Sequence, residues 1–258
     1  MQLINLPISK DRNMVTHVVR KNLSGYKRTL FSIYFLLRCT YNKLFLLDKF
    51  VNKYKRLHLG CGDIRLKNAV NVDSRATETT DIAHDCTDLS LFPHGSFSVV
   101  YAHAFFEHLF RNDRVRCLKS VFRILKEDGF ALFMGIPDFE RVAQAYLRHE
   151  KGIVSRTFDL FNVYRYTHGD PEQYPDWWLA QLHKSLFDTN EIKTLLHQSG
   201  FTNYYIFRYC FDKEKISLNL GFIAYKEKSK NKITLSELKK ILAQFPTKFN
   251  LRSLKIES

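Results

Sequence analysis

The chain contains 258 residues, of which 45% are hydrophobic, and it carries a formal net charge of +14. This length suits one α/β domain with appended helices, and the sequence has neither an uninterrupted apolar run of about 18 residues nor a charged-then-apolar leader, so it predicts no membrane-spanning helix and requires no secretion. The five cysteines form no Cys-x-x-Cys pair, which predicts neither a disulfide framework nor a zinc site and fits a reducing cytoplasm.

The positive charge is concentrated at the two ends of the chain. Residues 1–56 contain twelve Lys or Arg and two Asp, a net charge of +10, and residues 226–258 contain nine Lys or Arg and three Glu, a net charge of +6. The residues between them therefore carry −2. Basic ends on a nearly neutral body favour contact with an anionic surface, although solubility alone explains the charge equally well.

The N-terminal part of the chain predicts an arm followed by an amphipathic helix. Residues 1 to about 25 have no steady hydrophobic period, whereas residues 29–51 place apolar side chains on one side of a helix and basic ones away from it. The apolar positions are Leu30, Ile33, Tyr34, Leu37, Tyr41, Leu44 and Val51. Such a stripe either lies on an anionic bilayer or packs against the body, and we expect packing.

A glycine turn follows a short apolar run at residues 55–63. Leu57 and Leu59 predict a buried strand, and Gly60 and Gly62 remove side chains where that strand passes into a loop. In an open parallel sheet, nucleotides bind beyond the carboxyl end of a strand. We therefore expect a nucleotide-like cofactor to lie over Gly60 to Gly62.

Two acids follow the next two predicted strands. Residues 69–73 predict a strand that ends in Asp73, which is the candidate for binding a ribose. Asp85 follows the strand predicted at residues 81–84 and is the candidate for accepting from an adenine amino group. A turn residue and a helix cap are the structural alternatives for these acids. A dinucleotide fold is disfavoured because Arg65 stands where its fingerprint needs a small residue.

The rest of the chain alternates strands and helices, which predicts a parallel sheet with right-handed crossovers. Strands are expected at residues 97–102, 130–136, 204–211 and 217–226, the last two as an antiparallel pair, and helices at residues 112–125, 139–149, 189–199 and 235–242. Residues 152–176 predict an irregular, aromatic-rich insert. An insert at the strand ends usually builds the substrate pocket.

These motifs together resemble the class I S-adenosylmethionine-dependent methyltransferases, in the group with a Leu-x-Leu-Gly-Cys-Gly loop. The resemblance covers roughly residues 55–225 and rests on residues 57–62, 71–73, 85, 101–109, 123–129 and 183–187. It implies a Rossmann-like fold: a mostly parallel seven-stranded sheet with an antiparallel last strand and helices on both faces. The expected organisation is a basic arm and helix at residues 1–54, the methyltransferase domain at residues 55–226 with an insert at about 150–188, and a basic helical tail at residues 227–258.

The resemblance also implies the cofactor, S-adenosyl-L-methionine, and no metal. The residues expected to contact it are Leu59, Gly60, Cys61, Gly62, Asp73, Ser74, Asp85, Cys86 and His103. The sequence departs from the family pattern at His58, at Ser98 and at the pair Glu127 and Asp128. These departures leave open a non-catalytic partner protein that keeps the fold but not the activity.

Methyl transfer from a sulfonium needs alignment of donor and acceptor, and a hydroxyl acceptor also benefits from a base. His103, at the predicted end of the fourth strand, is the first choice for that base. His108 is expected to orient the helix start at Glu107. His183 is a second catalytic candidate, for which acceptor contact and structural hydrogen bonding are equally supported.

Several aromatic side chains in the insert suit a sugar or a flat base: Tyr164, Tyr166, Tyr174, Trp177 and Trp178. The expected function is methylation of a hydroxyl on a small molecule or a surface-glycan or glycolipid precursor, in polysaccharide biosynthesis, by a cytoplasmic enzyme whose basic ends contact an anionic membrane. The alternative of an RNA methyltransferase is disfavoured because no basic strip interleaved with aromatic residues runs through the body.

Overall fold

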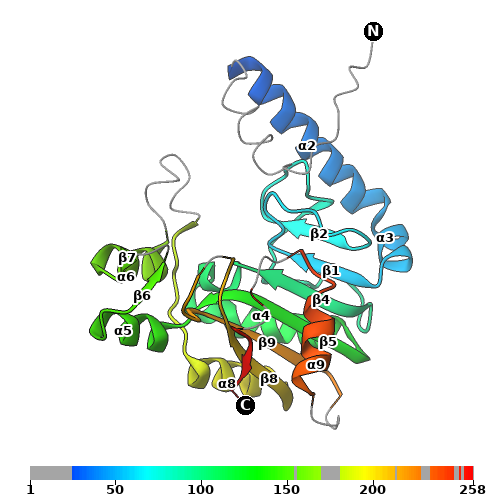
Figure 1. Cartoon of the computed structure of the whole chain (residues 1–258). Coiled ribbons are helices and arrows are strands. Elements are labelled where there is room, and N and C mark those ends of the chain that lie inside the picture. Colours follow the sequence, from blue (N-terminus) through cyan, green and yellow to red (C-terminus); the bar gives the residue numbers. More distant parts are fainter. Residues whose placement is uncertain are drawn as a thin grey trace.

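The computed structural model describes residues 25–153, 156–169, 181–212, 214–227, 233–246, 250 and 253–257. Its centre is an eight-stranded sheet with the order β10-β8-β9-β5-β4-β1-β2-β3 (Figure 1). The strands are β1 Arg56–Leu59, β2 Val70–Asp73, β3 Ile82–Ala83, β4 Phe97–His103, β5 Leu125–Pro137, β8 Asn203–Tyr209, β9 Asn219–Tyr225 and β10 Lys255–Ile256. The helices are α2 Gly25–Phe45, α3 Leu47–Lys53, η1 Phe106–His108, α4 Arg111–Ile124, α5 Phe139–Leu147, α6 Leu160–His168, α8 Thr189–Gln198 and α9 Leu235–Leu242.

The sheet confirms the predicted Rossmann-like topology. Strands β3, β2, β1, β4 and β5 run parallel, and β9 pairs antiparallel with both β5 and β8. Parallel strands have their carboxyl ends at one edge, so the loops after β1, β2, β4 and β5 meet there. The sheet has one strand more than the seven expected, because the two-residue strand β10 pairs antiparallel with β8 at its edge.

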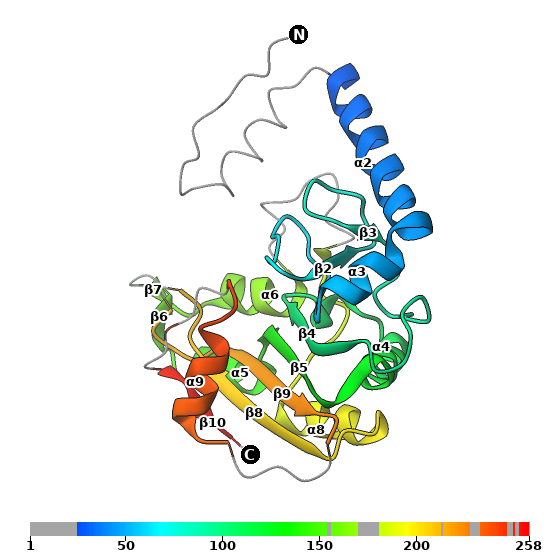
Figure 2. The same cartoon turned by 90° about the vertical axis from the view of Figure 1, so that its right-hand side faces the viewer.

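The two faces of the sheet bury different helices, because successive side chains of a strand point in opposite directions. Leu57, Leu59 and Val100 lie in the cluster that includes α4 and α8, with α3 packed against it. Val99 and Tyr101 lie in the cluster with Leu238 and Leu242 of α9. Figure 2 shows α9 lying across β8 and β9, and the expectation of helices on both faces is confirmed.

Two predicted segments differ from the structure. The fifth strand begins earlier than the expected residue 130: α4 ends at Ile124, β5 begins at Leu125, and the register with β4 shifts between Phe97 and Val99. The insert is not irregular throughout, since it contains a short hairpin, β6 Lys151–Ile153 and β7 Arg156–Thr157, and the helix α6. Local turn signals do not reveal these elements because Val163 and Tyr166 of α6 pack in a separate small cluster, against α5 and Leu218, rather than in the main core.

The expectation that the apolar stripe of α2 packs against the body is wrong, because the stripe is exposed. Six stripe residues are 47–67% exposed: Leu30, Ile33, Tyr34, Leu37, Tyr41 and Leu44. The opposite side of the helix contacts the body, where Cys39 and Asn42 are buried. These six residues form the α2 stripe.

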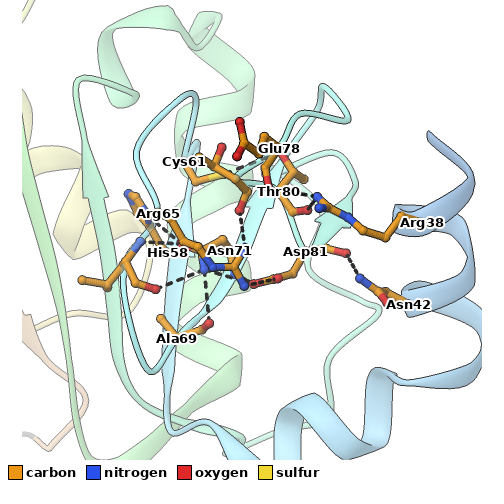
Figure 3. A network of polar contacts seen from close by, with 12 residues as sticks. Arg38, Asn42, His58, Cys61, Arg65, Ala69, Asn71, Glu78, Thr80 and Asp81 are labelled. Atoms are coloured by element: carbon orange, nitrogen blue, oxygen red, sulfur yellow. Dashed lines mark hydrogen bonds and ion pairs between the residues drawn. The ribbon is translucent and has the colours of Figure 1, made fainter. Parts of the chain in front are cut away.

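The contacts of α2 with the body are polar. Arg38 Nη2 donates to the carbonyls of Thr77 and Thr80 at 2.8 and 2.6 Å, and Asn42 Nδ2 donates to the carbonyl of Asp81 at 2.9 Å (Figure 3). Lys43 Nζ lies 3.2 Å from His84 Nδ1. Two basic residues that were expected to face outward therefore hold the helix to the body: Arg38 contacts the loop before β3, and Lys43 contacts His84 just after β3.

A sharp bend separates α2 from α3. Within the described part of the chain, no single helix is long and apolar enough to cross a membrane. The stretch Thr29–Phe45 and the helix Leu47–Lys53 reach that length and apolarity only together, and they meet at a bend of 76°. Beyond the bend, Phe50 and Val51 pack against the sheet core.

His58 makes the stability of the fold depend on pH. It is buried on the α9 side of β1, with Nδ1 3.1 Å from Asn71 Oδ1, and burial lowers its pKa to about 4. In the unfolded chain a histidine has a pKa of about 6.5. As pH falls from 6.5 toward 4, the unfolded chain gains a proton that the folded chain does not, so stability is lost in that window.

We predict that His58→Gln removes one part of this dependence. The free energy of unfolding of the wild type should fall relative to that of the variant by about 1 kcal/mol for each pH unit between pH 6 and 4.5. Urea unfolding at a series of pH values measures the difference. Parallel pH curves for the two proteins would contradict the assignment of a neutral buried histidine.

Candidate active site

The glycine turn after β1 depends on two glycines in the left-handed region. Gly60 and Gly62 have φ values of +60° and +51°, which side chains rarely adopt. A Cβ on Gly60 would lie 2.4 Å from Cδ2 of Phe105, a residue of the loop after β4. The nearest atom to a Cβ on Gly62 would be Nη2 of Arg75, at 3.8 Å. The turn is thus closed by Phe105 beside Gly60 and open beside Gly62.

Asp73 joins the glycine turn to the end of β2. Its Oδ2 accepts from the N–H of Gly62 at 2.8 Å, and its Oδ1 accepts from the N–H of Arg75 at 2.9 Å. The side chain is buried, and its carboxylate also pairs with Arg75 Nε at 3.5 Å. A carboxylate has about four acceptor positions, so Asp73 keeps capacity for a ribose hydroxyl. The turn-forming alternative is therefore realised, and the ribose role stays a prediction.

The loop between β2 and β3 folds back onto the turn. The hydroxyls of Thr77 and Thr79 donate to the carbonyl of Gly62 at 3.1 and 2.5 Å. Thr80 Oγ1 lies 3.7 Å from Sγ of Cys61. The sequence did not predict a role for these threonines. In the structure they hold the glycine turn in place through contacts with Gly62 and Cys61.

The other predicted cofactor residues lie in different surroundings. Leu59 and Cys86 are buried in the core beneath the turn, so they can meet a ligand only through main-chain atoms, and Ser74 is exposed. Asp85 is 55% exposed; its Oδ1 accepts from the N–H and the hydroxyl of Thr87, both at 2.8 Å. Its contact with an adenine amino group stays a prediction.

His103 lies at the carboxyl end of β4 with a buried ring nitrogen, Nε2, that has no hydrogen-bond partner among the described residues. Burial, with a smaller effect from His58, lowers the pKa of His103 to about 4, so the imidazole is neutral at physiological pH. A Cβ on the facing Gly135 would lie 3.2 Å from Nε2. The bare backbone of Gly135 therefore leaves room for this ring.

A second polar cluster contains Glu107, His108 and His183. Residues 182–185 run beside η1: the N–H of Lys184 donates to the carbonyl of Glu107 at 2.8 Å, and Ser185 Oγ donates to the carbonyl of Leu109 at 2.6 Å. This segment brings the ring of His183 to 5.1 Å from that of His108. The structure thus brings His183 to Glu107 and His108, and His103 stands instead against Phe211, at 5.8 Å between ring centres.

The sequence predicts for Glu107 only a structural role, at the start of a helix. Glu107 is only 2% exposed, its Oε1 lies 3.7 Å from Nε2 of His108, and its Oε2 has no hydrogen-bond partner within the described structure. Burial raises the pKa of Glu107 to about 8 and lowers that of His108 to about 4. In the sequence, only the neighbouring Glu107 and His108 hint at this site. The burial of Glu107 becomes evident only in the structure, where residues 182–187 lie beside η1.

The aromatic insert is described only in part. Tyr164 is partly exposed and stacks on His168, and the hydroxyl of Tyr166 donates to Glu214. Burial raises the pKa of Tyr166, so its hydroxyl stays protonated. Tyr174, Trp177 and Trp178 lie outside the described residues.

The site residues fit a nucleoside cofactor at the carboxyl edge of the sheet. The main chain at Gly62 is open, Asp73 has acceptor capacity beside it, and His103 Nε2 is a buried polar atom without a partner in the described chain. Gly60 to Gly62 and Asp73 are the residues that would hold S-adenosylmethionine. The departure at His58 does not remove this edge, because His58 is buried against Tyr101 on the α9 side.

We predict that Gly60→Ala destabilises the protein more than Gly95→Ala does. Gly95 has the same left-handed conformation, φ +63°, but no atom within 4 Å of its Cβ position, so alanine there costs only about 1–2 kcal/mol of backbone strain. Alanine at Gly60 adds overlap with Phe105, about 1–3 kcal/mol more. Denaturant unfolding measures both, and the double variant Gly60→Ala/Phe105→Ala should lose less than the sum of its single variants. Equal costs for the two glycines would show that Phe105 does not close the turn.

Known proteins resemble this chain in sequence and in fold. A family model described as a methyltransferase domain matches residues 57–133. No curated protein sequence matches the chain. A S-adenosylmethionine-dependent methyltransferase from Thermotoga maritima, titled a possible histamine N-methyltransferase, is 16% identical, with 82% of this chain and 99% of that chain covered and a TM-score of 0.43.

Two further structures are similar to the chain at comparable sequence identity and TM-score. A methyltransferase of this cofactor class from Archaeoglobus fulgidus is 16% identical, with 78% of this chain and 99% of that chain covered and a TM-score of 0.45. One from Clostridium acetobutylicum is 14% identical, with 83% and 98% covered and a TM-score of 0.42. Likenesses at this identity and TM-score carry no inference about substrate or site.

The segment that matches the family model contains the glycine turn, β2 with Asp73 at its end, β3 followed by Asp85, and β4, which ends in His103. Its strands also take the mostly parallel order that the motifs imply. Over residues 57–133 the chain is therefore similar to a methyltransferase domain, set within a Rossmann-like fold.

Proposed function

We propose that the chain is a S-adenosylmethionine-dependent methyltransferase that methylates a hydroxyl oxygen, with His103 as the base that takes the hydroxyl proton. The observation that carries the proposal is the buried, partnerless Nε2 of His103 at the carboxyl end of β4. S-adenosylmethionine supplies a methyl group on a sulfonium, which needs no activation by the protein. The acceptor oxygen forms the new bond to carbon as the carbon–sulfur bond breaks, and the acceptor proton passes to the imidazole.

The acceptor class that we propose is a small molecule or a surface-glycan or glycolipid precursor. Tyr164, partly exposed on α6, supports a sugar acceptor because aromatic faces pack against sugar rings. The charge distribution argues against RNA, since the body is nearly neutral and the basic residues are at the two ends. We infer a cytoplasmic enzyme in polysaccharide biosynthesis. These assignments go beyond the family match.

Binding of the donor is the first experiment, because it separates an active enzyme from a partner protein that only keeps the fold. Titration calorimetry with S-adenosylmethionine should give one site per chain, and Asp73→Ala should weaken it at least about tenfold because a buried charge-assisted contact is lost. Asp85→Ala, at an exposed position, is the comparison. Absence of heat with wild-type protein would favour the non-catalytic alternative.

We predict that His103→Gln lowers the methylation rate by about 10²–10⁴-fold while the dissociation constant of S-adenosylmethionine changes little. Release of S-adenosylhomocysteine measures the rate with monosaccharides and lipid-linked sugars as acceptors, and low-salt assays with RNA test the rival substrate. An unchanged rate in the variant would remove His103 from the reaction.

The pH profile provides a second check on the base. Because the pKa of His103 is about 4, the wild-type rate should stay level as pH falls from 8 to 5.5, and the imidazole should become protonated only near pH 4. An ordinary histidine base would lose half its activity near pH 6.5. A half-loss at pH 6.5 would therefore contradict the environment described for His103.

A further inference from the structure

Three potential metal ligands lie together where the segment 182–187 meets η1. One ligand atom each from Glu107, His108 and His183 lies within 4.8 Å of the other two. The cluster is enclosed: Glu107 is 2% exposed and the side chain of His108 is 17% exposed. Two imidazoles and one carboxylate form a donor set that first-row transition metals prefer.

The ring orientations of both histidines fit metal binding. His108 Nδ1 lies 3.2 Å from the carbonyl of Leu182, and His183 Nδ1 lies 2.9 Å from the carbonyl of Tyr166. A carbonyl only accepts hydrogen bonds, so both Nδ1 atoms carry the proton and both Nε2 atoms keep a lone pair. Metal-binding histidines are usually oriented in this way, by a hydrogen bond from the other ring nitrogen.

The carboxylate is the second observation that points to a ligand. Oε2 of Glu107 is buried and has no hydrogen-bond partner among the described residues. A buried carboxyl oxygen without a partner costs free energy unless a cation or a donor satisfies it. The cationic side chain of Lys184, on the segment beside the cluster, donates instead to the main-chain carbonyl of His108 and lies over the ring of Phe110.

We propose that Glu107, His108 and His183 bind one divalent first-row transition-metal ion. Metal–ligand bonds are about 2.0–2.2 Å long. Ligand atoms that lie within 4.8 Å of one another can therefore reach one ion placed between them by small side-chain movements. Three protein ligands leave a coordination position open. That position suits a water molecule, whose proton a bound metal ion makes more acidic. The cysteine spacing used to exclude zinc could not detect this set, which comes from residues 75 positions apart.

Cobalt titration of the full chain tests the site without an activity assay. Untagged protein, freed of metal by a chelator, should gain visible absorption with Co²⁺ that saturates at one ion per chain, and Zn²⁺ should displace it. His183→Asn should weaken Co²⁺ binding at least about tenfold. His149→Asn is the matched control, because it removes an exposed histidine at a left-handed position that asparagine tolerates.

Each outcome decides the proposal. Equal Co²⁺ binding by wild type and His183→Asn, or no saturable absorption at millimolar Co²⁺, would overturn it. Glu107→Gln provides a second variant should His183→Asn unfold, and thermal melts of the metal-free proteins monitor folding. Calorimetry with S-adenosylmethionine on the same samples separates the two proposals, because donor binding without metal binding leaves the proposed function standing.

A separate observation concerns the α2 stripe. Its six residues point away from the body, since the opposite side of α2 carries Arg38 and Asn42, which are bonded to the loop before β3. Figures 1 and 2 both show the N-terminal half of α2 standing clear of the sheet. The exposed apolar surface continues on both flanks of the stripe at Phe31, Leu36 and Phe45. A contiguous apolar surface of this kind marks a binding face.

We infer that the α2 stripe binds the surface of an anionic bilayer. Residues 1–56 carry a net charge of +10, which complements anionic lipid headgroups. The same charge opposes a second copy of the chain on the stripe, because two such segments would repel each other. Tyr34 and Tyr41 also suit the headgroup region, where an aromatic ring is buried and its hydroxyl stays hydrated. The polar bonds of Arg38 and Asn42 keep the apolar side outward.

Vesicle flotation tests this inference. The wild type should float with vesicles of phosphatidylcholine and phosphatidylglycerol, less with phosphatidylcholine alone, and less at high salt. Leu37→Glu/Leu44→Glu should lower the partition coefficient at least about tenfold, by loss of apolar contact and by charge repulsion. The matched control is Leu147→Glu/Leu160→Glu, whose leucines are 73% and 67% exposed on α5 and α6.

Equal flotation of the two double variants would overturn the inference. So would a wild type that ignores anionic vesicles and sediments as a dimer, if Leu37→Glu/Leu44→Glu then sediments as a monomer. That result would assign the stripe to a second copy of the chain.

Discussion

The buried hydrogen-bonded pair of Asn71 and Asp81 holds together the edge of the sheet on which the site is built. Asp81 Oδ2 accepts from both the N–H and the Nδ2 of Asn71, at 2.9 and 3.0 Å, while Asn71 Oδ1 accepts from the N–H of Leu66 and contacts His58 (Figure 3). One amide and one carboxylate thereby join β1, β2 and the loop before β3. Because that loop also carries the threonines that reach Gly62, the position of the glycine turn depends on this pair.

The sequence was most informative where one local requirement decides the structure. Two glycines in a turn after an apolar strand, and acids after the following strands, leave few foldable alternatives, so the glycine turn and the parallel strands around it were predictable. The burial of Glu107 was not, because it depends on residues 182–187, which arrive from more than 70 positions away. Glu-His at the start of a helix gives no sign of whether its carboxylate meets solvent or core.

Helix α2 shows a different limit. A hydrophobic period reports that one side of a helix avoids water, but it does not identify what covers that side. The body instead binds the polar side, through a guanidinium placed against main-chain carbonyls, and such contacts leave no periodic signature in the sequence. Expectation and structure thus agree on the helix and disagree on its orientation.

The attachment of α2 by directional bonds to main-chain carbonyls has a consequence for how this protein can diverge. Carbonyl oxygens are present whatever residues occupy positions 77, 80 and 81, so these bonds to the helix do not depend on the side chains of those residues, which act within the loop and the sheet edge instead. Substitutions on the outward side, in turn, alter no packing in the interior. The outward side of α2 can therefore change at a different rate from the sheet and its loops.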